Sequence, residues 1–170
     1  MASPMYVDAL IGTPFSVVLK DALVRQEDVR LINGNPLTGT KSCLEDSVGV
    51  KTSEITAIPE GADANEMFGW IMPRTNQFST SRSYFSWLMG KKEYDLDARV
   101  KGGERHIIMS GEYDSVLPMD IYGEFLIKAI IAGDIDKMEQ LGIYEVSPED
   151  FALAEFVDSS KLELQRIVRQ

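Results

Sequence analysis

The hydrophobic pattern of this 170-residue chain changes near residue 110. Before that point, short apolar runs are separated by Gly, Pro and Asn clusters; after it, apolar residues recur at helical spacing. The charge changes there as well, since residues 111–160 hold 12 acidic residues against Lys128 and Lys137, whereas the remaining residues hold 15 acids and 15 bases. We therefore expect an α+β protein built from two different parts.

The first part, residues 5–72, is predicted to form a small β-grasp-like α+β unit. Thr13 and Pro14 suit the start of a helix, because a proline at the first helical position loses no hydrogen bond. The apolar residues that follow share one helix face: Phe15, Val18, Leu19, Ala22 and Leu23. Strands are expected over residues 6–11, 29–32 and 66–72, one or two strands are expected within residues 48–58, and a turn is expected at 33–36.

Residues 73–110 have the weakest pattern and are expected to connect the two parts. A short helix is predicted over residues 84–89, where an aromatic and apolar cluster ends at Gly90. A strand is predicted over residues 105–109, after the Gly102-Gly103 pair.

Residues 111–170 are predicted to form a C-terminal helical domain. One helix is expected from Pro118 to Gly133, with Ile121, Phe125, Ala129 and Ile130 facing inward. A second, short helix is expected between a cap at Asp134 and Gly142. Ser147–Asp150 has the form of a capping box, and Ser160 is expected to cap the last helix, with Leu164, Ile167 and Val168 inward.

The composition limits the chemistry that is available. A single cysteine, Cys43, and a single histidine, His106, allow no internal disulfide and no zinc site made by this chain alone. A net charge of −10 argues against a nucleic-acid partner. Neither residue has an evident catalytic partner, so we interpret Cys43 as an ordinary thiol and His106 as structural or surface. We predict no catalytic, cofactor-binding or metal-binding residue.

Two further patterns resemble ligand sites only weakly. Residues 33–40 are rich in Gly and Thr but lack the lysine and spacing of a phosphate-binding loop, so a β-turn loop is the simpler interpretation. The acidic residues of 111–160 lack the order of a calcium loop, and most of them fall at expected helix starts, where they complement the helix dipole.

Basic and aromatic residues alternate between residues 74 and 92. Aromatic residues and arginine are enriched at the energetic centres of protein interfaces. We predict a partner-docking surface that includes Arg74, Phe78, Arg82 and Trp87. The alternative, that the aromatic residues belong to the core, is equally compatible with the pattern.

Six motifs occur in the order found in the A subunit of the bacterial Na(+)-translocating NADH:quinone reductase (Na+-NQR), which the chain therefore resembles. Residues 29–39 are similar to its ISGSVLTG stretch, and residues 66–73 to its ELFGW-MP run. The other similar stretches are 78–83, 117–120, 132–134 and 149–157. The resemblance covers nearly all of this chain and implies a C-terminal part of that subunit.

The resemblance implies the biological setting. Such a complex uses NADH, flavins, an iron–sulfur centre, quinone and Na+, with no cofactor in this part. The implied partners are other subunits, including integral membrane flavoproteins, and quinone is a further candidate ligand. The implied location is peripheral, on the cytoplasmic face of the bacterial inner membrane, and residues 6–72 resemble the soluble-ligand-binding β-grasp module. The alternative is a free-standing β-grasp protein that binds a small ligand or acts as an adaptor.

The helical domain also resembles the tail of the C subunit of Rnf electron-transfer complexes, which holds ferredoxin-like clusters. Spacing places Pro148, Phe151, Ala154 and Asp158 where the four cysteines would fall. A four-iron cluster needs thiolates, which these residues cannot supply. We therefore expect a ferredoxin-like helical domain without a cluster, whose dry apolar centre lies around Phe151, Ala154 and Met138.

Overall fold

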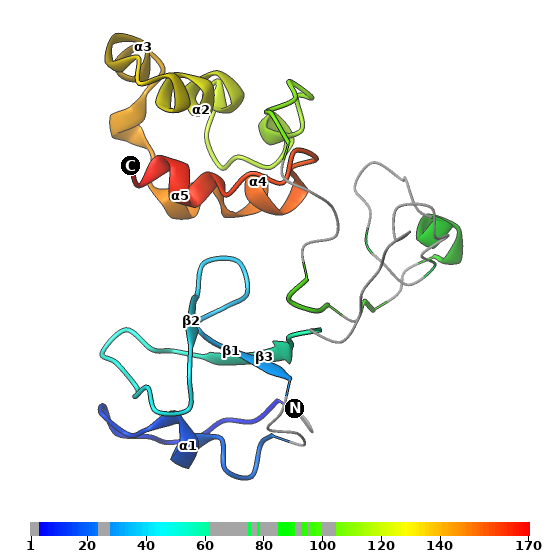
Figure 1. The fold of residues 1–170 in the computed structure, drawn as a ribbon, viewed down its shortest axis with the longest axis vertical. Helices are drawn as coiled ribbons and strands as arrows, with labels where there is room; N and C mark the ends of the chain where they lie inside the picture. Colours follow the sequence, from blue (N-terminus) through cyan, green and yellow to red (C-terminus); the bar gives the residue numbers. More distant parts are fainter. Residues whose placement is uncertain are drawn as a thin grey trace. The chain divides into compact units, whose positions relative to one another are not determined.

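The computed structural model describes residues 4–23, 28–61, 75, 78, 85–90, 93–94, 96–99 and 105–170. The chain divides into two compact units, residues 1–101 (unit 1) and residues 102–170 (unit 2). Unit 1 holds a small antiparallel sheet and unit 2 holds helices (Figure 1), which agrees with the predicted mixture of helices and strands. The strand predicted over residues 66–72 lies outside the described residues.

The sheet of unit 1 has three strands in the order β2-β1-β3. Strand β1 (Val29–Asn33) lies between β2 (Thr40–Ser42) and β3 (Ile55–Pro59) and is antiparallel to both. Leu31 is opposite Ser42 on one side and opposite Ala57 on the other. The prediction of a strand over residues 29–32 is confirmed.

The core of unit 1 forms where one turn of helix packs on this sheet. Helix α1 (Phe15–Val18) is only one turn long, and turns continue the chain to Ala22. Side chains alternate along a strand, so Val29 and Leu31 share the face that meets Phe15. The buried core residues are Phe15, Leu19, Ala22 and Leu31. Pro14 itself is the N-cap, so Thr13 is not the cap that the sequence predicted.

The loop between β1 and β2 is held by one side chain. Asn35 Oδ1 accepts hydrogen bonds from the backbone N–H groups of Leu37 and Thr38, each at 2.8 Å. A Cβ atom at Gly39 would lie 2.5 Å from Ile32 Cγ2 and from the Asn35 carbonyl oxygen, so this position requires glycine. The loop is thus a turn whose N–H groups are already used, which favours the β-turn interpretation.

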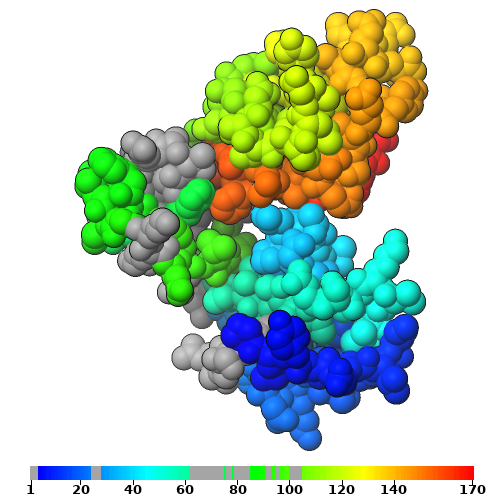
Figure 2. All heavy atoms as spheres, turned by 180° about the vertical axis from the view of Figure 1, so that it is seen from behind, coloured from blue at the N-terminus to red at the C-terminus, as the bar shows by residue number. Residues whose placement is uncertain are grey.

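The strands of unit 1 differ from the predicted ones in part. Residues 6–11 form no strand and instead lie exposed on the surface of their unit (Figure 2, dark blue). Of the one or two strands expected within residues 48–58, one forms, β3, because residues 49–52 turn. Strand β2 was not predicted because its sequence, Thr-Lys-Ser, carries no apolar alternation.

Unit 2 is a cluster of short helices. Its α-helices are α2 (Gly123–Ala132), α3 (Ile135–Gln140), α4 (Ala152–Val157) and α5 (Leu164–Val168). Its 3-10 helices are η2 (Tyr113–Ser115), η3 (Ile143–Glu145) and η4 (Pro148–Phe151). The fully buried apolar centre contains Tyr113, Leu126, Ile127, Phe151, Ala154 and Leu164.

The predicted helix ends are confirmed where local chemistry sets them. Gly133 ends α2 with a φ of 68°, a left-handed conformation that glycine adopts readily. Asp134 caps α3 by accepting a hydrogen bond from the Lys137 N–H at 3.2 Å. Ser147 donates its N–H to Asp150 Oδ2 at 2.7 Å, which forms the predicted capping box.

Other predictions for unit 2 are wrong. Helix α2 begins at Gly123 and not at Pro118, and Phe125 faces outward, 54% exposed, while Leu126 and Ile127 are buried. Residues 105–109 form no strand. Helix α5 is capped at Glu163, whereas Ser160 is buried outside the helix.

Candidate functional site

The four positions aligned with cluster cysteines do not share one environment. Phe151 and Ala154 are fully buried in the apolar centre of unit 2, which is where the prediction placed them. Pro148 is half-buried at the start of η4, and Asp158 is buried directly after α4. Met138 is half-buried on α3 and is not part of the buried centre.

Asp158 makes this centre partly polar, contrary to the expectation of a wholly apolar one. Its side chain is 1% exposed, and its carboxylate accepts hydrogen bonds from the N–H groups of Ser160 at 3.0 Å and Leu162 at 2.8 Å. A buried carboxylate requires such donors, because an unpaired one would lose its hydration without compensation. Asp158 therefore fixes the loop that joins α4 to α5.

The same loop anchors the segment that enters unit 2. The carbonyl oxygen of Ser160 accepts a hydrogen bond from the Arg105 N–H at 2.8 Å, and its Oγ accepts one from the Ile108 N–H at 3.0 Å. Ser160 is fully buried. The residue predicted as a helix cap thus joins residues 105–108 to the Asp158 loop.

Tyr113 lies beside Asp158 in the buried centre. Its hydroxyl oxygen makes no hydrogen bond within the described part of the chain. Burial, and next the negative charge of Asp158, raises the pKa of Tyr113 well above its ordinary value. The phenol therefore stays neutral at physiological pH.

Glu124, which sequence reasoning missed, has a similar structural role. It is 6% exposed, and its Oε1 accepts hydrogen bonds from the N–H groups of Gly111 at 2.7 Å and Ser110 at 3.1 Å. Glutamate in a first helical turn is common on exposed surfaces, so nothing in the local sequence signals its burial.

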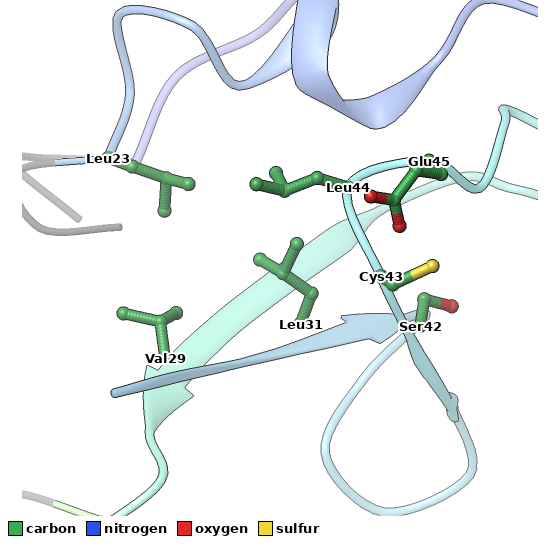
Figure 3. A pocket seen from close by; sticks show the side chains of 7 residues that line it. All are labelled: Leu23, Val29, Leu31, Ser42, Cys43, Leu44 and Glu45. Atoms are coloured by element: carbon green, nitrogen blue, oxygen red, sulfur yellow. The ribbon is translucent and has the colours of Figure 1, made fainter. Parts of the chain in front are cut away.

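Unit 1 contains a hollow of about 300 Å³ beside strand β1, bordered by Leu23 and by the end of β2 with the loop that follows it (Figure 3). Four aliphatic side chains face one another across it, and Ser42, Cys43 and Glu45 border it at one end. The aliphatic residues are Leu23, Val29, Leu31 and Leu44. Walls of this kind suit a small apolar group.

The two residues with potential reactivity show no catalytic arrangement. Cys43 is exposed, and the neighbouring Glu45 carboxylate raises the pKa of its thiol, which reduces the thiolate fraction. His106 is exposed in an irregular segment. Both observations agree with an ordinary thiol and a surface histidine.

No family model matches this chain. Curated relatives named as the A subunit of the Na(+)-translocating NADH-quinone reductase do match it. The relative from Vibrio atlanticus is 32% identical over 99% of this chain, and that from Haemophilus influenzae is 34% identical over 98%. The relative from Tolumonas auensis is 32% identical over the whole chain. The chain is a homologue of a part of this A subunit.

The chain spans 37–38% of the length of these A-subunit relatives. The prediction that it resembles a part of the A subunit is confirmed, and the matches are consistent with the C-terminal part. The region shared with these relatives covers both units of the chain, and it makes up only part of a longer protein that carries the A-subunit name.

The predicted docking residues of this A-subunit homologue are described only in part. Arg74 and Arg82 lie outside the described residues. Phe78 is 44% exposed, and its ring packs edge-to-face on Tyr94 at 5.9 Å. Trp87 is 51% exposed on the 3-10 helix η1 (Phe85–Met89), whose position agrees with the helix predicted over residues 84–89.

The described ranges were also compared with the requirements of a metal site and of a membrane-spanning helix. They contain no group of three or more His, Cys, Asp or Glu side chains placed to hold a metal ion. None of the helices in the described ranges is long and apolar enough to cross a membrane.

Proposed function

We propose that this chain is a structural and docking part of the A subunit in a Na+-pumping NADH:quinone oxidoreductase. The observation that carries the proposal is the 32–34% identity to such A subunits over at least 98% of the chain. In this proposal, the chain contributes to quinone reduction coupled to Na+ transport by holding other subunits in place. NADH, flavins, the iron–sulfur centre and Na+ act elsewhere in the complex.

Exposed aromatic and apolar residues support a docking role. On η1, Phe85, Trp87 and Met89 are each more than half exposed, while Ser86 is buried. Apolar clusters of this kind are unfavourable on a free surface and frequent at interfaces. The partners we propose are the integral membrane flavoprotein subunits, at the cytoplasmic face of the inner membrane.

A pull-down from membranes of the source organism tests the proposal. The full subunit that contains this chain, with a tag, should retain the membrane flavoproteins. Reversal of two charges, Arg74→Glu with Arg82→Glu, should weaken that retention while unit 1 stays folded. The matched control is Lys20→Glu with Lys51→Glu, which reverses two exposed charges of the same unit outside the docking stretch. Equal retention by both pairs would contradict the docking surface.

The hollow beside strand β1 favours a second candidate function. In this function the chain is a free-standing protein that binds a small ligand. That function requires no membrane partner. Recovery of the tagged subunit without flavoproteins, together with saturable binding of a small apolar ligand, would favour this candidate over the first.

A further inference from the structure

The hollow beside strand β1 combines apolar walls with one polar end. Its walls are aliphatic side chains that come from Leu23, from β1 and from Leu44 (Figure 3). Ser42, Cys43 and Glu45 border the hollow where β2 ends and the next loop begins. Among the lining residues, only Glu45 carries a charge. The hollow therefore suits a ligand that is apolar along its length and polar at one end.

The charge of Glu45 is not balanced by the cations of the neighbouring strands. The residues that line the hollow from β1 and β2 alternate with Arg30 and Lys41, so these two cations lie on the other face of the sheet. Both contact Glu60 there, Arg30 at 2.5 Å and Lys41 at 3.8 Å. Within the described part of the chain, Glu45 forms no ion pair. Its carboxylate is thus free to meet a cationic group.

The polar end of the hollow offers hydrogen-bond acceptors rather than donors. A carboxylate only accepts hydrogen bonds, and a thiol is a weak donor. The Cys43 thiol already interacts with the Glu45 carboxylate, which raises the pKa of the thiol. Ser42 Oγ donates to the Thr40 carbonyl oxygen at 3.4 Å, so its lone pairs face a ligand as acceptors. A head group that donates hydrogen bonds complements this end, whereas a quinone, which has carbonyl acceptors, does not.

We propose that the hollow binds a primary alkylammonium compound, with its alkyl chain between the aliphatic walls and its ammonium group at the Glu45 carboxylate. An ammonium group has three N–H donors and a positive charge, which match the acceptors and the charge of the polar end. A volume of about 300 Å³ is at the lower end for ligand pockets, so the chain is short. The inference rests on the second candidate function, because both use this hollow, and it names the class of ligand.

Titration of the 170-residue chain with short amines, followed by NMR, tests the proposal. Butylamine should cause saturable shifts in the amide signals of Val29, Leu31 and Leu44. Each methylene group added between ethylamine and butylamine should tighten binding about fourfold, because it enters apolar surroundings. Butanol has the same chain without the charge and should bind about threefold more weakly than butylamine. Pentanoate, which places a carboxylate on that chain, should bind more weakly than butanol because it would face Glu45.

The variant Glu45→Gln tests the contact assigned to the head group. Glu45 is exposed, so the variant should fold like the unaltered chain. It should weaken the binding of butylamine about threefold and leave the binding of butanol unchanged. The matched control Glu54→Gln, which removes an exposed carboxylate outside the lining of the hollow, should change neither. Unchanged binding of butylamine by Glu45→Gln would overturn the proposal.

Four other outcomes would also overturn it. Equal affinity for butanol and butylamine would show that the hollow does not select the head group, with the second candidate function intact. Failure of every probe to bind would show that the chain itself fills the hollow, and that function would lose its support as well. Tighter binding of duroquinone than of butylamine would assign the hollow to an acceptor ligand. Tighter binding of butylamine by Arg25→Gln, at a position outside the described residues, would show that this arginine neutralises Glu45.

Discussion

The two units bury their apolar residues to different extents. In unit 2, helices from four places in the sequence meet in a centre where six side chains are completely buried. Among the described residues of unit 1, the buried cluster has four members, of which Phe15 is completely buried, and the apolar segment 5–11 lies outside it. The difference shows that apolar content does not by itself bury a segment, since residues 5–11 pair with no other segment in the described part of the chain.

Unit 2 reaches its complete core without cysteine ligands. Phe151 and Ala154 are fully buried at two of the four positions that we predict to correspond to cluster cysteines. At the last of the four, the Asp158 carboxylate accepts hydrogen bonds from backbone N–H groups. Apolar packing and a hydrogen-bonded carboxylate thus have the structural role that we expect a cluster to have in that tail. This interpretation of the four positions stays a prediction.

Among the variants considered for the two units, removal of the Phe151 ring should cause the largest loss of stability. Phe151→Ala should lower the free energy of unfolding of unit 2 by about 3–5 kcal/mol, because it leaves a cavity in a tightly packed centre. Urea denaturation followed by far-UV circular dichroism measures the loss. Phe125→Ala, on the exposed face of α2, should cost less than about 1 kcal/mol. Equal losses would show that the centre is not packed as described.

Truncation of Asp158 should have the next largest effect. Asp158→Ala leaves the Ser160 and Leu162 N–H groups buried without acceptors, which should cost about 2–4 kcal/mol by the same denaturation measurement. Asp158→Asn keeps an acceptor oxygen and should cost less. The control Asp114→Ala removes an exposed carboxylate and should be nearly neutral. A neutral Asp158→Ala variant would mean that the loop does not depend on this carboxylate.

The sequence predicted those features of unit 2 that depend on a few neighbouring residues. Gly133, Asp134 and the Ser147 capping box act within one helical turn, so their chemistry can be read locally. The inward face of α2 could not be read in this way. Residues 125–132 are apolar on nearly all sides, so their periodicity does not select Leu126 and Ile127 over Phe125.

Strands were harder to predict because a strand exists only with a partner. Val29–Asn33 was predicted correctly, and it has a neighbour on each side. Residues 6–11 have similar apolar character but no partner within the described part of the chain, and they form no strand. For the site, the burial of Phe151 and Ala154 was predicted. The contacts of Glu124 depend on residues more than ten positions away, and those of Asp158 on an irregular loop that has no sequence signature.

The smallest expected effect concerns the thiol of unit 1 and leaves stability unchanged. Glu45 raises the pKa of Cys43, so at pH 8 this thiol should react more slowly with a disulfide reagent than an unperturbed exposed cysteine. The rate should increase as the pH rises through the raised pKa. Glu45→Gln should accelerate the reaction at pH 8, whereas Asp21→Asn, which changes an exposed carboxylate that does not act on the pKa of this thiol, should not. An unchanged rate in Glu45→Gln would contradict the assigned cause.

The helices of unit 2 enclose a fully buried apolar centre, whereas residues 6–10 of unit 1 pair with no other segment among the described residues. Hydrogen exchange measured residue by residue on the 170-residue chain tests this contrast most directly. The account predicts that the slowest amides lie in α2 and α4 and that residues 6–10 exchange at nearly the rate of an unfolded chain, independently of protein concentration. Protection of residues 6–10 equal to that of α2 would contradict it.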